Sequence, residues 1–140
     1  MALERVDPAD LPIAQTYSHV VTATGSRLVF VAGQVAEDRD GNLVGPGDMA
    51  AQARQAFANI GRALAAAGAR PDQVTKITIF VVDLRDAHLP AIEQGRLATF
   101  GDHRPADSLV GVQALAHAGC LIEVEAIAVT DGAYAARGLM

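Results

Sequence analysis

Apolar residues in the first third of the chain follow the pattern of a buried strand. The stretch RLVFVAGQ at 27–34 is short and apolar and closes in a glycine turn, so we expect a strand there. The polar stretch EDRDGN at 37–42 contains Asp40-Gly41, which predicts a hairpin-type turn. A weaker alternation at 17–23, YSHVVTA, is compatible with one more strand.

The pattern then changes to the spacing of helices. Asp48 can cap a helix and Gly68 can end one, so we expect a helix over 49–67. Asp86 can cap a second helix over 87–100. The expected core stripe of this second helix is Leu89, Ile92, Leu97 and Phe100. The segments expected to form the remaining strands are 74–82, 108–112 and 121–129.

Both faces of these predicted strands are apolar. In 121–129, Ile122 and Val124 point one way, while Leu121 and Ile127 point the other. The expected order is strands, helix, strand, helix and strands, and two helices can cover only one face of such a sheet. Soluble monomers rarely expose a large apolar patch, so we expect the second face to pack against other subunits.

Composition limits the class of protein. The length of 140 residues and the 51% of hydrophobic residues fit one domain, residues 1–140. The net charge of -5 and the scattered arginines argue against binding to nucleic acid or to an acidic membrane surface. No apolar run is long enough to span a bilayer. The only cysteine, Cys120, forms no internal disulfide, which fits a cytoplasmic protein.

The clearest chemical candidates are Glu123 and Glu125, two residues apart on one strand face. Partial burial between Leu121 and Ile127 would raise a carboxyl pKa and suit it to proton transfer. The alternative is a pair of solvated or salt-bridged acids at a strand edge. The four histidines show no metal-ligand spacing, so we expect no metal site. Cys120 fits a small buried residue better than a nucleophile.

Taken together, these segments resemble the Rid family, the RidA/YjgF-type reactive-intermediate deaminases. The similarity extends from about Tyr17 to Thr130. It is carried by VFVAGQVAEDRDGNLV, DMAAQARQAFANIGRALAAAGA, VTKITIFVVDLRD, RPADSLVGVQALA and IEVEAIAV.

The resemblance implies a chorismate-mutase-like α+β fold, with a mixed β-sheet and two helices on one face. It further implies a homotrimer whose sheets pack as a central barrel, with ligand clefts between subunits. It also implies hydrolysis of enamines and imines, such as 2-aminoacrylate, to ammonia and a 2-keto acid without a metal or organic cofactor. In this family an arginine grips the substrate carboxylate, and a glutamate positions the attacking water.

Residue by residue, the resemblance assigns the water-positioning glutamate to Glu123 and the cleft tyrosine to Tyr17. The strand glycine falls on Gly33, preceded by Ala32 where a serine is usual. The arginine of the family's P-A-R-S stretch is replaced by Asp107, and Leu109 stands where cysteine is common. A helix asparagine that often reaches the cleft falls near Glu93 in a loose alignment.

The kind of substrate that this protein can bind therefore depends on Asp107. An Arg→Asp exchange would repel a substrate carboxylate, by up to about 4 kcal/mol per contact at 4 Å and an effective dielectric near 20. One explanation is that the substrate is neutral or cationic. A second is that an anionic substrate is held elsewhere, for example by the nearby Arg104. The third is that Asp107 is solvated or ion-paired and does not contact the substrate. We expect a hydrolase or deaminase acting on an imine-like metabolite other than a standard 2-imino acid. The alternative is a non-catalytic metabolite-binding or protein-stabilising homotrimer, and the acidic charge argues against a third idea, RNA cleavage.

Overall fold

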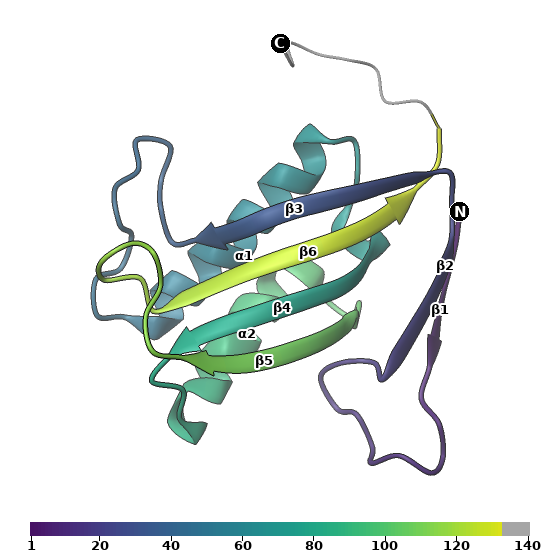
Figure 1. Cartoon of the computed structure of the whole chain (residues 1–140), viewed down its shortest axis with the longest axis horizontal. Helices are drawn as coiled ribbons and strands as arrows, with labels where there is room; N and C mark the ends of the chain where they lie inside the picture. Colours follow the sequence, from purple (N-terminus) through teal and green to yellow (C-terminus); the bar gives the residue numbers. More distant parts are fainter. Residues whose placement is uncertain (133–140) are drawn as a thin grey trace.

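The computed structural model describes residues 1–132, in which two helices lie on one face of a four-stranded sheet (Figure 1). Residues 133–140 of the expected domain lie outside the described residues. In chain order the elements are β1 (Ala2–Val6), β2 (Val20–Thr24), β3 (Arg27–Val35), α1 (Met49–Ala66), the 3-10 turn η1 (Pro71–Gln73), β4 (Val74–Val82), the 3-10 turn η2 (Asp86–His88), α2 (Leu89–Phe100), β5 (Ala106–Val112) and β6 (Ile122–Thr130).

The sheet has the strand order β3-β6-β4-β5. Strand β6 runs antiparallel to both of its neighbours, whereas β4 and β5 are parallel because α2 carries the chain back between them. This arrangement confirms the predicted α+β class, the mixed sheet and the two helices on one face. Within residues 1–132 the sheet stays open, with β3 and β5 at its edges, so the barrel expected from three subunits stays a prediction.

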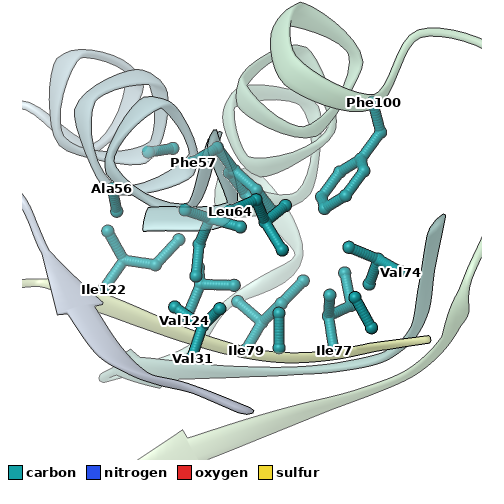
Figure 2. Packing of buried hydrophobic residues seen from close by; sticks show 14 of the residues in the cluster. Val31, Ala56, Phe57, Leu64, Val74, Ile77, Ile79, Phe100, Ile122 and Val124 are labelled. Atoms are coloured by element: carbon teal, nitrogen blue, oxygen red, sulfur yellow. The ribbon is translucent and has the colours of Figure 1, made fainter. Parts of the chain in front are cut away.

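The core lies between the helices and the sheet (Figure 2). Apolar residues of α1 repeat at helical spacing, and every second residue of β4 and β6 points toward them. An irregularity between Val74 and Lys76 changes the alternation, so Val74 joins the same core. The residues that Figure 2 labels are Val31, Ala56, Phe57, Leu64, Val74, Ile77, Ile79, Phe100, Ile122 and Val124.

Helix α2 differs from its prediction. It begins at Leu89 after a short 3-10 turn, and His88 rather than Asp86 occupies the cap position. Of the expected stripe, Ile92 and Phe100 are buried, but Leu89 and Leu97 are 42% and 46% exposed. The physical reason is that α2 rests on α1 through Gly95, where an added Cβ would lie 2.9 Å from Ala53. This close approach turns Gly95 and Arg96 inward in place of the two leucines.

A hairpin at the N-terminus was only partly predicted. The weak strand expected at 17–23 is observed as β2, which pairs antiparallel with β1. Strand β1 was missed because LERVDP is charged and is followed by a proline. Figure 1 shows this hairpin beside the main sheet rather than within it.

The sheet face away from the helices carries exposed apolar side chains, which we call the open face. Phe30 is 70% and Leu28 is 59% exposed there. In the described part of the chain, no helix is both long and apolar enough to cross a membrane.

Candidate functional site

Glu123 lies on the open face, at the start of β6. It is paired with Phe80 of β4 and Val35 of β3, beside an irregularity between Val31 and Gln34. Gly33 sits in this irregularity, and a Cβ built on it would lie 2.7 Å from Glu123 Cδ. The missing side chain therefore makes room for the carboxylate. Within residues 1–132, no group donates a hydrogen bond to the Glu123 carboxylate, which leaves its oxygens available to a ligand or water.

Glu125 shares the open face, as the two-residue spacing predicted. It is paired with Thr78 of β4 and is exposed, whereas Glu123 is half-buried. Glu125 lines a shallow cavity of about 390 Å³ together with Phe30 and Lys76. The structure thus separates the two acids into a half-buried one beside Gly33 and an exposed one over the centre of the sheet.

Asp107 lies on the opposite face of the sheet from Glu123. Its partner in β4 is Ile77, a core residue, so the Asp107 side chain points toward α2. There it lines a cavity of about 330 Å³, which we call the α2 cavity. The residues that line the α2 cavity are Thr16, Ile79, Leu89, Pro90, Ile92, Glu93, Arg96, Asp107 and Leu109.

An internal ion pair forms the charged side of the α2 cavity. Arg96 is only 3% exposed, and its Nε and Nη2 donate to the Glu93 carboxylate at 2.9 and 2.5 Å. Its Nη1 donates to the His103 carbonyl at 3.1 Å. Burial raises the pKa of Asp107 from 3.8 to about 6, opposed by the charges of Lys76 and Arg96 and reinforced by Glu93. Asp107 is therefore a half-buried acid in strand β5 and not a solvated loop residue.

The remaining candidates lie around these two acids. Leu109 lines the α2 cavity next to Asp107. Tyr17 is half-buried and packs edge-on against His19, with ring centroids 5.3 Å apart, while its neighbour Thr16 reaches the cavity. Arg104 is held at its backbone, where its carbonyl accepts a bond of 2.6 Å from Ser18 Oγ, and it is not among the residues lining the cavity.

One chain therefore brings the candidates together in two groups. Gly33 lies against Glu123 on the open face, and Ala32 lines the neighbouring shallow cavity. Asp107 and Leu109 lie in the α2 cavity, on the helix side of the sheet. Within one chain, Glu123 and Asp107 therefore lie on opposite faces of the sheet.

Sequence reasoning missed Arg96. A signal was present, because Glu93 and Arg96 are three residues apart on a helix and can form an ion pair. What the sequence did not reveal is that this pair faces inward. Cys120 is buried as predicted, and burial raises the pKa of its thiol. No cluster of potential metal ligands occurs in residues 1–132.

Comparison with known proteins places this fold in a family. Residues 9–130 match the family model described as Endoribonuclease L-PSP. A rat protein named 2-iminobutanoate/2-iminopropanoate deaminase is 34% identical over 88% of this chain and 85% of its own length. The human protein of the same name is 31% identical, over 81% of this chain and 79% of its own length.

Solved structures agree with the sequence comparisons. The Rid-family protein YyfB from Yersinia pestis superposes with a TM-score of 0.86 at 37% identity, covering 92% of this chain and 99% of the other. A YjgF/YER057c/UK114-family protein from Mycobacterium tuberculosis gives a TM-score of 0.63 at 30% identity, over 91% and 99% of the two chains. With its sequence, its two-helix sheet and its relatives in agreement, the chain belongs to the YjgF/RidA (Rid) family, which the Endoribonuclease L-PSP model represents.

Proposed function

We propose that this protein is a cytoplasmic hydrolase that deaminates an imine or enamine at clefts between the subunits of a homotrimer. The relatives named as 2-iminobutanoate/2-iminopropanoate deaminases support the reaction class. The proposed reaction requires neither a metal nor an organic cofactor.

The observation that carries this proposal is the Glu123 carboxylate beside Gly33. The side chain is half-buried, and its carboxylate accepts no hydrogen bond within the described residues. A water molecule can therefore donate a hydrogen bond to it. Glu123 takes a proton as this water attacks the imine carbon and forms the new C–O bond. Glu123 returns this proton to the nitrogen of the adduct. The new hydroxyl group then gives up its proton, which also reaches the nitrogen as the C–N bond breaks, and the products are ammonia and a carbonyl compound.

Asp107 argues for a substrate other than a standard 2-imino acid. An arginine at this position would grip a carboxylate with two parallel hydrogen bonds. The carboxylate of Asp107 repels such a group, and the one arginine in the same cavity, Arg96, is already bonded to Glu93 and to a carbonyl. We therefore expect the wild-type protein to hydrolyse 2-aminoacrylate and 2-iminobutanoate slowly or not at all.

The same substitution supports one competing function. A chain without the arginine that binds the substrate carboxylate can serve as a non-catalytic trimer that binds a metabolite or stabilises a partner. Turnover distinguishes the two functions, because a binding protein holds its ligand without consuming it.

The test is a panel of freshly generated imines. Flavin-dependent oxidases release imines that bear a carboxylate from amino acids and imines without one from primary amines. A trapping nucleophile then reports how fast the added protein removes each imine. We expect removal of at least one imine without a carboxylate and little removal of 2-iminobutanoate.

Matched variants assign the chemistry. Glu123→Gln should reduce turnover by about 10²–10⁴-fold with little change in melting temperature, as for loss of a general base. Glu125→Gln removes the same charge from the same strand face and should stay near wild type. Asp107→Arg should create or raise activity on 2-iminobutanoate, within limits set by Leu109 and Ala32. Full activity in folded Glu123→Gln protein would remove Glu123 from the mechanism, and no turnover of any imine would favour the binding protein.

A further inference from the structure

The α2 cavity presents acceptors to a ligand and no free cation. We infer that Asp107 makes this cavity select ligands that carry a cationic hydrogen-bond donor, such as an ammonium, amidinium or guanidinium group, on a short apolar body. The inference rests on the proposed function only in treating this cavity as part of the substrate site. The binding preference itself is a property of the cavity.

The α2 cavity is lined by both charged and apolar side chains. The charged ones are Asp107 and the paired Glu93 and Arg96. The apolar ones are Ile79, Leu89, Pro90, Ile92 and Leu109. A volume of about 330 Å³ is at the small end of the range for ligand pockets, which suits a metabolite of a few carbon atoms.

The one cation that lines the cavity is already paired with a carboxylate. The three guanidinium nitrogens of Arg96 all donate within the protein, two to Glu93 and one to the His103 carbonyl. The only lysine, Lys76, lies on the open face, where its Nζ donates to Ser108 Oγ at 2.8 Å. An anion entering the α2 cavity would have to compete with Glu93 for the Arg96 guanidinium, while Lys76 lies on the other face of the sheet.

The balance of charge favours a cation. With Glu93 and Arg96 paired, the formal charges are -1, +1 and -1, which leaves -1 on Asp107. Within residues 1–132 no hydrogen bond reaches the Asp107 carboxylate, although it has lost part of its hydration. A ligand N–H that bonds to this carboxylate compensates both the charge and the missing hydrogen bond.

Three small molecules of similar shape and different charge test this preference on the full-length protein. The probes are n-butylammonium, 1-butanol and butyrate, and their dissociation constants are measured by calorimetry or NMR titration. We expect n-butylammonium to bind roughly tenfold or more tightly than butyrate, with 1-butanol between them. Asp107→Asn should weaken n-butylammonium binding by about tenfold while preserving the shape of the side chain.

Asp102→Asn is the matched control, because it removes one negative charge from an exposed residue five positions earlier that does not line the cavity. It should leave all three dissociation constants unchanged.

If Asp107→Asn does not fold, the wild-type protein provides the same test through pH. Between about pH 8 and about pH 5 the probe stays protonated while Asp107 gains a proton, so n-butylammonium binding should weaken. The charged groups that act on Asp107 are Glu93 and Arg96 from α2, which line the same cavity, and Lys76 of β4, which acts across the sheet from the open face.

The inference is overturned if butyrate binds as well as n-butylammonium, or if Asp107→Asn and Asp102→Asn bind n-butylammonium alike. Its failure can be told apart from failure of the proposed function. Glu123→Gln should bind n-butylammonium like wild type even when turnover is lost. Selective n-butylammonium binding without turnover of any imine would support this inference and reject the proposed enzyme. Imine turnover by a protein that binds butyrate more tightly than n-butylammonium would support the enzyme and reject this inference.

Discussion

Asp107 has a destabilising electrostatic role that its substitution should reveal. Its pKa is about 6 in the folded protein and 3.8 for an unperturbed carboxyl, with burial as the main cause. The folded state therefore binds the proton more tightly than the unfolded state. Stability should fall as the pH rises from about 4 to about 6, and then level off.

We accordingly expect Asp107→Asn to increase the free energy of unfolding near pH 7 by on the order of 1 kcal/mol, after allowance for solvent at the mouth of the cavity. Near pH 4 the variant and the wild type should differ little, because Asp107 is then mostly protonated in the folded protein. Urea denaturation at the two pH values measures the difference. A gain of equal size at both pH values would mean that charge is not the cause.

Gly33 should control the position of the Glu123 carboxylate. A methyl group at Gly33 would collide with the distal end of the Glu123 side chain rather than with backbone. Because that end is flexible, Gly33→Ala should move the carboxylate with little loss of stability. We expect kcat on an imine that the wild type hydrolyses to fall about tenfold or more, with KM nearly unchanged, as for a misplaced catalytic group. A raised KM with unchanged kcat would contradict this positioning role.

The two acids also show how far the sequence alone reaches at the residue scale. The two-residue period of a strand was enough to place Glu123 and Glu125 on one face. It could not show that Asp107 faces α2, since that depends on the pairing of Asp107 with Ile77 in a parallel register. The raised pKa of Asp107 follows from this placement. Family resemblance identified Asp107 as unusual without indicating its surroundings.

At the scale of elements, the packing of α1 against α2 makes two glycines respond in opposite ways. In α1, a Cβ at Gly61 would meet Thr99 Cγ2 at 3.6 Å, an ordinary contact. In α2, a Cβ at Gly95 would lie 2.9 Å from backbone and side-chain atoms of Ala53. Backbone cannot move aside without shifting the helix.

Gly61→Ala should therefore stabilise the protein by about 0.5–1 kcal/mol, because alanine costs less backbone entropy in a helix. Gly95→Ala should destabilise it by about 1–3 kcal/mol through overpacking. Urea midpoints followed by circular dichroism, at one fixed protein concentration, measure both effects. Equal shifts of the same sign in the two variants would show that helix propensity, not the close contact between α1 and α2, dominates.

The same contact explains which elements the sequence predicted well. The regular apolar period of α1 and the β-branched run of β4 agree with the structure to within a residue at each end. The inward face of α2 was predicted from leucines, but the close approach at Gly95 selected a different face and buried Arg96. Strand β1 depends on its pairing with β2 and has little hydrophobic signal of its own. Tertiary contacts, and not local propensity, decided these two cases.

At the scale of the whole molecule, the open face is the feature that one chain leaves unexplained. Phe30 and Leu28 are largely exposed and Phe80 and Ile127 are half-buried, all on the face without helices. Glu123 lies on this same face, while Asp107 lies behind the sheet. Assembly of three copies would cover the apolar surface and could bring Glu123 of one subunit to the α2 cavity of another.

We therefore predict that the wild-type protein sediments at three times the 14.5 kDa chain mass at micromolar concentration. Phe30→Glu should yield a folded monomer, because it would bury an unpaired carboxylate in the interface at a cost of several kcal/mol. Leu97→Glu, on the outer side of α2, is the matched control and should stay trimeric. Sedimentation with circular dichroism separates dissociation from unfolding. The monomer should also lose imine turnover, since no single chain holds both acids on one face. A wild-type protein that sediments as a monomer would exclude both the trimer and a site shared between subunits.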